Sequence, residues 1–194
     1  MKILALDSSG LVASVAVVEN DTLLAEYTVN YKKTHSQTLL PMLDEISNMT
    51  ELDLSTIDAI AVAGGPGSFT GLRIGSATAK GLGLALEKPL ISIPTTAAIA
   101  YNIWDTNKFV CPIMDARRNQ VYTGVYCYTD HRLDTVWEQD TMSIEALAEG
   151  LNCLDHEVIF LGDGVAVYRE KLEALLTIPF SFAPAHVNRQ RAAA

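Results

Sequence analysis

The sequence has few of the residues that build metal and disulfide sites. It contains three cysteines, Cys111, Cys127 and Cys153, which form neither a CxxC pair nor an even set, and four scattered histidines. Closely spaced Cys or His residues normally mark zinc sites, and disulfide frameworks use an even number of cysteines. The sequence therefore predicts reduced, buried thiols in a cytoplasmic protein and no metal site.

Basic residues are also scarce. The chain of 194 residues carries 14 Lys and Arg against 23 Asp and Glu, a formal net charge of −9. Its largest basic clusters are the pairs Lys32–Lys33 and Arg117–Arg118. Because autonomous binding of nucleic acid depends on a basic surface that neutralises phosphates, we expect any contact with RNA to be indirect, through a partner that supplies positive charge.

Long uninterrupted hydrophobic runs are missing, although 49% of the residues are hydrophobic. Asp7 interrupts the first apolar run, and Arg73 and Lys80 interrupt the glycine-rich segment that follows later. A secretory signal or a membrane helix needs a longer run than these. The sequence thus predicts a protein without a membrane span, in which some apolar surface is available for a partner.

One arrangement of segments occurs twice. An apolar segment ends at Asp7, turns and resumes at residues 12–18, and another ends at Asp115 and resumes at residues 121–128. Each half also contains an apolar segment, a glycine loop and a helical pattern in that order, at residues 58–86 and 157–176. A duplicated α/β unit explains both repeated patterns, and we place the domains at residues 1–105 and 106–194.

The remaining patterns complete the first half. They predict a strand at residues 22–29, a helix from Ser36 to Met49, a strand at 89–94 and a helix from residue 95. In the first helix, Leu39, Leu43 and Ile46 fall on one face. The last residues, 187–194, are similar to the opening of a helix, so we expect the second domain to be truncated at its last helix.

Seven of the twelve glycines lie within residues 64–86. The segment does not match the P-loop, because Ala79 precedes Lys80 and Gly81 follows it, nor does it match G-x-G-x-x-G. It leads to a predicted helix that begins near Ser68, and a helix N-terminus attracts anions in general. Small residues recur every four positions along that helix, which places them on one ridge: Gly67, Gly71, Gly75, Ala79 and Gly83.

The ridge needs a close contact that compensates for its glycines. Each glycine inside a helix costs about 1 kcal/mol relative to alanine. A second helix from a partner molecule is the interpretation that we favour, and tight packing inside the chain's own domain is the alternative.

Four stretches of the sequence resemble the bacterial TsaB family, also called YeaZ. They are ALDSSG, THSQTLLPML, GPGSFTGLRIG followed by AKGLGLAL, and DARRNQVYTGVY, in the family's order over essentially the whole chain. The resemblance implies an α/β protein with a duplicated actin-like (ASKHA, RNase H-like) fold and two mixed-sheet subdomains. It also implies a non-catalytic dimerisation or scaffold subunit of the complex that forms threonylcarbamoyladenosine next to the anticodon of tRNA.

The resemblance further implies the partners. They are TsaD, the catalytic paralogue, as the other half of a heterodimer, TsaE, which binds the pair, and TsaC, which supplies the activated threonylcarbamoyl group. The chain itself would require no cofactor, with the interface to its partner as the expected place for ATP or ADP. The same two helices would form a homodimer when the chain is alone. We expect these residues at the interface: Leu39, Leu43, Ile46, Gly67, Gly71, Leu72, Gly75, Ala79 and Gly83.

A motif of the catalytic paralogue is absent. TsaD proteins carry a metal-binding H-x-x-x-H after the strand that follows the glycine-rich helix, and Thr95 and Ile99 stand at those positions here. Neither side chain is an imidazole ligand. The resemblance therefore implies no catalytic and no metal residues in this chain.

The ends of the first strand of each half carry the remaining candidate residues. We expect Asp7 to cap its own turn, and Asp115 and Arg117, which belong to the family signature, to form a local charge-assisted network. The alternative function is a stand-alone actin-like ATPase or kinase relative. A weak nucleotide contact would then involve Asp7, Ser8, Gly65, Gly67, Gly162 and Gly164.

Overall fold

The computed structural model describes residues 1–31 and 35–194, so the Lys32–Lys33 pair lies outside the described residues. Two compact units are present, residues 1–95 with 190–194 and residues 96–189. The domain boundary predicted after residue 105 is the point at which the repeated sequence pattern begins again. Packing instead groups residues 96–105 with the second unit, because Ile99 and Ala100 belong to a core of that unit.

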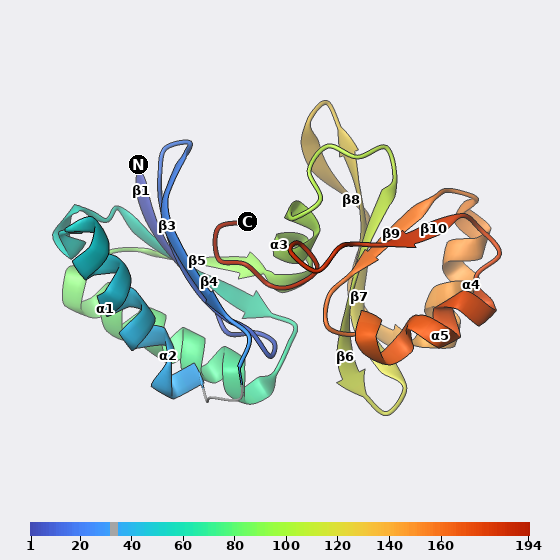
Figure 1. Ribbon diagram of the computed structural model, residues 1–194, viewed down its shortest axis with the longest axis horizontal. Helices are drawn as coiled ribbons and strands as arrows, with labels where there is room; N and C mark the ends of the chain where they lie inside the picture. The colour runs from blue at the N-terminus through green and yellow to red at the C-terminus, as the bar shows by residue number, and fades with distance from the viewer. Residues whose placement is uncertain (32–34) are drawn as a thin grey trace. The chain divides into compact units, whose positions relative to one another are not determined.

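The first unit is built on a five-stranded sheet with the order β3-β2-β1-β4-β5 (Figure 1). β1 (Lys2–Asp7), β2 (Ala13–Glu19) and β3 (Thr22–Val29) are antiparallel neighbours, whereas β4 (Ala59–Gly65) and β5 (Leu90–Pro94) are added parallel to β1. Parallel neighbours need crossover connections, which helices supply here. The sheet is therefore mixed, as predicted.

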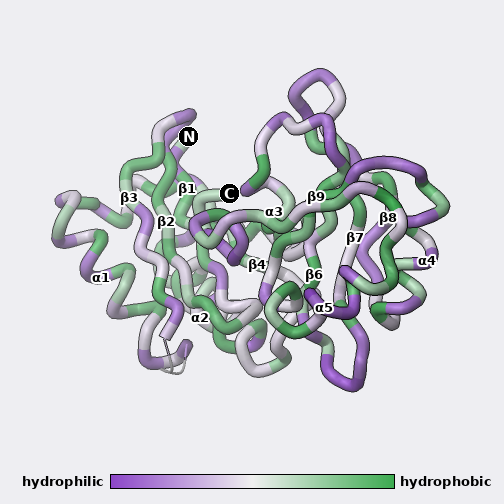
Figure 2. Tube along the Cα trace, turned by 45° about the vertical axis from the view of Figure 1, so that its right-hand side comes forward, coloured by the Kyte–Doolittle hydropathy of each residue, from purple (hydrophilic) through white to green (hydrophobic). Residues whose placement is uncertain are grey.

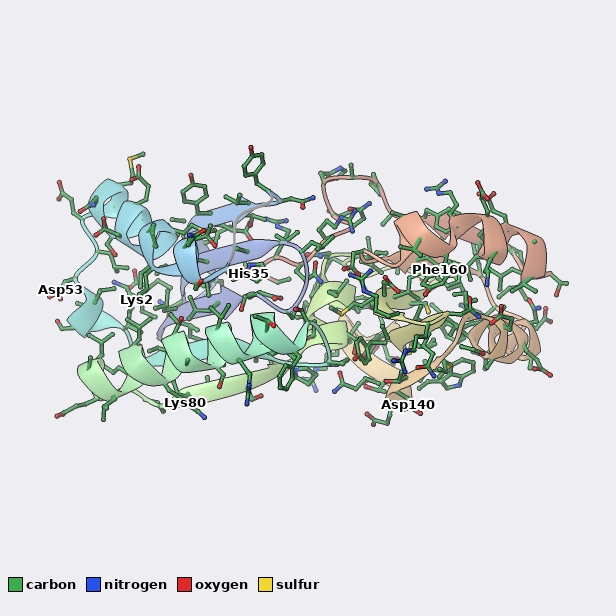
Figure 3. The ribbon with its side chains drawn as sticks, turned by 90° about the horizontal axis from the view of Figure 1, so that it is seen from below. Lys2, His35, Asp53, Lys80, Asp140 and Phe160 are labelled. Carbon is green, nitrogen blue, oxygen red and sulfur yellow. The ribbon has the colours of Figure 1, made fainter. Side chains whose placement is uncertain are left out.

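Two helices cover one face of this sheet (Figures 1 and 3). α1 (Leu39–Thr50) begins at Leu39 rather than Ser36, because residues 35–37 form the 3-10 turn η1 (His35–Gln37). A second 3-10 turn, η2 (Leu54–Thr56), follows it, and α2 (Phe69–Leu86) agrees with its prediction. Hydrophilic and hydrophobic residues alternate along α1 in Figure 2, the pattern of an amphipathic helix.

The core of the first unit fills the space between this sheet and its helices. Its buried members come from alternating positions of β1 and β2 and from the inner face of α1, because successive strand residues point to opposite faces. They include Leu4, Leu6, Val15, Val17, Leu39, Leu43 and Ile46.

The second unit repeats the topology of the first. Its sheet has the order β10-β9-β6-β7-β8, with antiparallel β6-β7-β8 and parallel β6-β9-β10. Read from the other end, each strand corresponds to one of β3-β2-β1-β4-β5, which confirms the duplication. The elements are α3 (Thr95–Tyr101), β6 (Phe109–Arg117), β7 (Gln120–Thr129), β8 (Arg132–Ser143), α4 (Ile144–Leu154), β9 (Val158–Leu161), α5 (Val165–Leu175) and β10 (Phe180–Phe182).

Helices cover both faces of the second sheet. α4 and α5 bury one core, which includes the fully buried Phe160, and α3 buries another, which includes Tyr126. No helix in residues 1–31 and 35–194 is long and apolar enough to cross a membrane.

The last residues of the chain form turns, so the predicted opening of a helix at 187–194 is wrong. Residues 190–194 instead pack on the first unit. Arg191 Nε donates to Glu26 Oε2 at 3.0 Å, and the Ala192 amide donates to Ser14 Oγ at 2.9 Å. Glu26 thus pairs with the Arg191 charge and Ser14 accepts from the Ala192 amide, so neither group needs a helix for its hydrogen bonds.

Candidate functional site

The start of α2 lies against the turn that follows β1. The Ser68 amide donates to the Ser9 carbonyl at 2.7 Å, and Ser8 Oγ donates to the Gly71 carbonyl at 2.9 Å. Ser68 caps the helix, since its Oγ accepts from the Gly71 amide at 3.3 Å. The N-terminus of α2 thus packs on the chain's own β1 turn.

Glycines make this approach possible. A Cβ on Gly67 would lie 2.3 Å from the Ser9 carbonyl oxygen, and one on Gly71 would lie 2.0 Å from that of Ser8. A Cβ on Gly75 would lie 2.5 Å from Ser8 Oγ. Because atoms this close would overlap, any side chain here would push α2 away from the turn. The glycine ridge therefore packs inside its own domain, the alternative that the sequence left open.

The burial of these residues corrects the predicted partner interface. A side chain enclosed in the core cannot contact a partner while the unit stays folded. Only Gly67 and Leu72, which are half-buried, retain accessible surface. The buried members of the predicted interface are Leu39, Leu43, Ile46, Gly71, Gly75, Ala79 and Gly83.

Outside their buried stripes, the same two helices carry exposed apolar residues. Leu40 is 52% exposed and Met49 78% on α1, and Phe69 is 70% exposed and Leu84 82% on α2. The Arg73 guanidinium lies over the Phe69 ring, 4.5 Å from its centroid. We call these five residues the outer α1/α2 face, although Leu40 and Met49, nine positions apart, lie on the two opposite flanks of α1. Figure 3 views this side of the helices and labels Lys80 on α2, which is also exposed.

Sequence reasoning missed the outer α1/α2 face. The available signal was the presence of apolar residues on both sides of each helix, beyond the stripe that a single core needs. The exposed apolar side chains on these two helices make them a candidate contact site.

Asp7 is held inside the β1 turn. Its Oδ1 accepts hydrogen bonds from the Ser9 amide at 2.8 Å and from Ser9 Oγ at 2.7 Å, which confirms the predicted cap. Burial raises the pKa of Asp7, against the lowering effect of the Ser9 hydrogen bonds. The carboxyl group thus serves its own turn.

The corresponding strand end of the second unit carries a polar network. Arg117 Nη1 lies 3.2 Å from Asp115 Oδ2, and Tyr168 Oη donates to Asp115 Oδ1 at 3.0 Å. The Asp115 amide donates to Asp163 Oδ1 at 3.3 Å, and burial raises the pKa of Asp163. The predicted local network of Asp115 and Arg117 is confirmed, with Tyr168 as an additional member.

The glycines after β9 fit closely against β6. Gly162 has a φ of +100°, and a Cβ there would lie 2.2 Å from the Ile113 carbonyl oxygen. The Gly164 amide donates to that same oxygen at 3.0 Å. Both glycines are therefore required by the strand-to-helix turn, whether or not a nucleotide contacts them.

The two positions of the missing H-x-x-x-H motif lie on α3. Thr95 is fully buried, and Ile99 packs in the core of the second unit. In the described part of the chain, no group of three or more His, Cys, Asp or Glu side chains is arranged to hold a metal ion.

Relatives of known name match nearly the whole chain. The family described as "TsaD: tRNA N6-adenosine threonylcarbamoyltransferase" matches residues 22–193. The tRNA threonylcarbamoyladenosine biosynthesis protein TsaB of Bacillus subtilis is 35% identical over 176 residues, which cover 91% of this chain and 77% of that protein. The TsaB protein of Escherichia coli is 33% identical over 170 residues, covering 84% and 72%.

Comparison with solved structures also finds similarity to a YeaZ protein. YeaZ from Pseudomonas aeruginosa superposes with a TM-score of 0.79 at 28% identity, over 97% of this chain and 87% of that one. The ROK hexokinase of Thermus thermophilus, at 14% identity and a TM-score of 0.51 over 97% and 96% of the two chains, shares the fold alone. The predicted duplicated actin-like fold is confirmed.

Proposed function

The chain belongs to the TsaB (YeaZ) family, and we propose that it is a non-catalytic dimerisation subunit in the formation of threonylcarbamoyladenosine in tRNA. In this role it docks on the catalytic subunit TsaD and supports it. The observation that carries the proposal is the outer α1/α2 face, which presents four large apolar side chains and an arginine to solvent.

The composition of this face suits a protein partner. Aromatic residues, Met and Arg are enriched at the centres of protein interfaces. Complete burial of a Leu, Met or Phe side chain contributes about 1.5–3 kcal/mol. Burial of these four residues, together with the Arg73–Phe69 pair, would contribute apolar surface to a dimer contact.

Two features support a non-catalytic role. Thr95 and Ile99 occupy the positions at which the catalytic paralogue carries its metal-binding histidines, and Ile99 contributes to a core. Asp7 is engaged by Ser9 within its turn. We infer that catalysis resides in TsaD and that this chain contributes the docking surface.

The same proposal covers the remaining partners. TsaE binds the pair, TsaC supplies the threonylcarbamoyl group, and any ATP or ADP lies at the interface with TsaD. Because the net charge is −9, tRNA is held by the partner and not by this chain. In the absence of TsaD, the outer α1/α2 face forms a homodimer, and the complex works in the cytoplasm.

Size exclusion with light scattering tests the proposal. The chain is mixed with TsaD from the same organism, with and without ATP and magnesium. Wild type should give a one-to-one complex, and Leu84→Glu and Met49→Glu should abolish it without lowering the melting temperature. Val167→Glu is the matched control, because Val167 is an exposed apolar residue of α5.

Two results would contradict the proposal. One is a complex that both glutamate variants still form. The other is hydrolysis of ATP by the chain alone, which would favour the stand-alone ATPase.

A further inference from the structure

A groove runs between β3 and α1 in the first unit. It has a volume of about 400 Å³, with Tyr27 and Val29 of β3 on one wall and Pro41, Met42 and Glu45 of α1 on the other. Tyr27 is 42% exposed although it lies on the helix-covered side of the sheet. The groove uses none of the five residues of the outer α1/α2 face and is large enough for one or two bulky side chains.

The strand that forms one wall is also an edge of the sheet. β3 is the end strand of the order β3-β2-β1-β4-β5, and within residues 1–31 and 35–194 no strand pairs with its outer side. Its eight residues span about 26 Å. Exposed edges are commonly protected by Lys or Pro, but the β3 sequence TLLAEYTV contains neither. It presents Leu23 and Leu24, 46% and 39% exposed.

A free edge beside a groove has the geometry of strand addition. An extended peptide that pairs with such an edge places alternate side chains on one face of the sheet. Along β3, that face is the one covered by α1, so every second side chain of the added strand would point into the groove. The backbone supplies affinity, and the groove selects the side chains.

We propose that β3 and the groove beside α1 bind an extended segment of another protein. The segment adds a sixth strand to the sheet and inserts an aromatic or branched aliphatic side chain between Tyr27 and Met42. A basic residue two positions away pairs with Glu45, the one formally charged side chain among the described residues that line the groove. This surface shares no residue with the outer α1/α2 face, but it adjoins that face at Met49, which lies one turn beyond Glu45 on α1.

Charge identifies the occupant as a basic segment and not a second copy of this chain. A second copy would offer its own β3, whose only charged residue is Glu26. Glu26 points to the face of the sheet away from α1, where it pairs with Arg191, so this strand offers no basic side chain to Glu45. Each of the two molecules also carries a net charge of −9. Like charges placed close together oppose association.

Selection from a library of displayed linear eight-residue peptides tests the proposal, with the full chain as bait. Peptides that also bind Tyr27→Ala are discarded. The survivors should share a large apolar residue and a basic residue two positions apart. In fluorescence anisotropy they should bind Glu45→Lys at least roughly tenfold more weakly than wild type, as expected for loss of a central interface contact. Asp44→Lys, on the same helix but outside the groove, should bind normally.

Methylation of the peptide backbone separates strand addition from other modes of binding. N-methyl groups on alternate amides should abolish binding at the positions that face β3 and have no effect at the others. Three results would overturn the proposal: no peptide that binds wild type but not Tyr27→Ala, equal effects of methylation at every position, or binding of the selected peptides that is unchanged in Glu45→Lys. A concentration-dependent dimer that Tyr27→Ala dissolves would instead assign the groove to a second copy.

Discussion

Replacing Gly71 with alanine tests whether the glycine ridge packs on the chain's own turn. A Cβ on Gly71 would lie 2.0 Å from the carbonyl oxygen of Ser8, about 1 Å closer than the 3.0 Å limit of real contacts. The obstacle is backbone, which cannot rotate away as a side chain can. The same helix contains a matched control, because a Cβ on Gly81 would meet no other atom within 4 Å.

The two substitutions should have opposite signs. Overpacking of a well-packed site costs about 1–3 kcal/mol, and the contact with buried backbone places Gly71→Ala in the upper part of this range. Gly81→Ala should stabilise the fold by about 1 kcal/mol, the difference in helix propensity. Since 1 kcal/mol shifts the melting temperature of a chain this size by about 2–4 °C, we expect a decrease of about 5–10 °C for Gly71→Ala. For Gly81→Ala we expect an increase of about 2–4 °C.

Thermal denaturation followed by circular dichroism measures both changes, and light scattering with TsaD measures binding in parallel. Unchanged stability of Gly71→Ala combined with loss of the complex would refute the internal packing and restore the ridge as an intermolecular seam. Gly75→Leu is a poor test of docking, because a Cβ there already meets Ser8 Oγ at 2.5 Å. Its loss of binding would follow from unfolding.

Three further predictions concern other sites. Burial raises the pKa of Asp7 above 3.8. The stability that the neutral carboxyl group provides is therefore present below pH 3.8 and is lost as the pH rises through the folded-state pKa. Asp7→Asn should raise the melting temperature at pH 7 and leave it unchanged below pH 3.8. Arg191→Ala should cost about 1 kcal/mol in urea denaturation, because the largely buried Glu26 loses its charged donor. Iodoacetamide at pH 8 should alkylate the exposed Cys153 but not Cys111, whose pKa burial raises to about 12, as mass spectrometry would show.

Much of the fold follows from local sequence patterns. The strand that ends at Asp7, its return strand and the glycine loop after β4 were each identified, because buried strands and turns have short, local signals. β8 and α4 were not identified, although they complete the repeat. Seven of the twelve β8 residues are exposed, so its sequence lacks the apolar run that marks β6.

Local sequence signals predict the start of α2 correctly but not the structure of the last residues of the chain. Ser68 was recognised as the start of α2 and is its N-cap, since a side-chain cap is a local signal. The segment at 187–194 was expected to begin a helix, yet Arg191 contacts Glu26, 165 residues earlier in the chain. A contact over that separation overrides helix propensity and cannot be deduced from neighbouring residues.

The candidate site shows why spacing alone gave the wrong surface. A ridge of small residues every four positions indicates that another segment packs closely against the helix, but it does not show whether that segment belongs to the same chain or to a partner. In this chain the contacting segment is the turn after β1. The carbonyl and hydroxyl of Ser8 lie where side chains on Gly71 and Gly75 would be. Only the burial of each residue distinguishes the two cases, and burial depends on the whole fold.

The contacts of α2 also connect the packing of the glycines to the proposed role. In an actin-like fold, a helix N-terminus next to the first strand's turn is well placed to attract phosphate, through its dipole and free amides. Here that space is taken: Ser68 binds the Gly71 amide, and the carbonyl of Ser9 accepts from the Ser68 amide. Because α2 lies so close to the β1 turn, its inner face is committed to the domain. Only its outer face, with Phe69 and Leu84, is free to recognise another molecule, as a docking subunit requires.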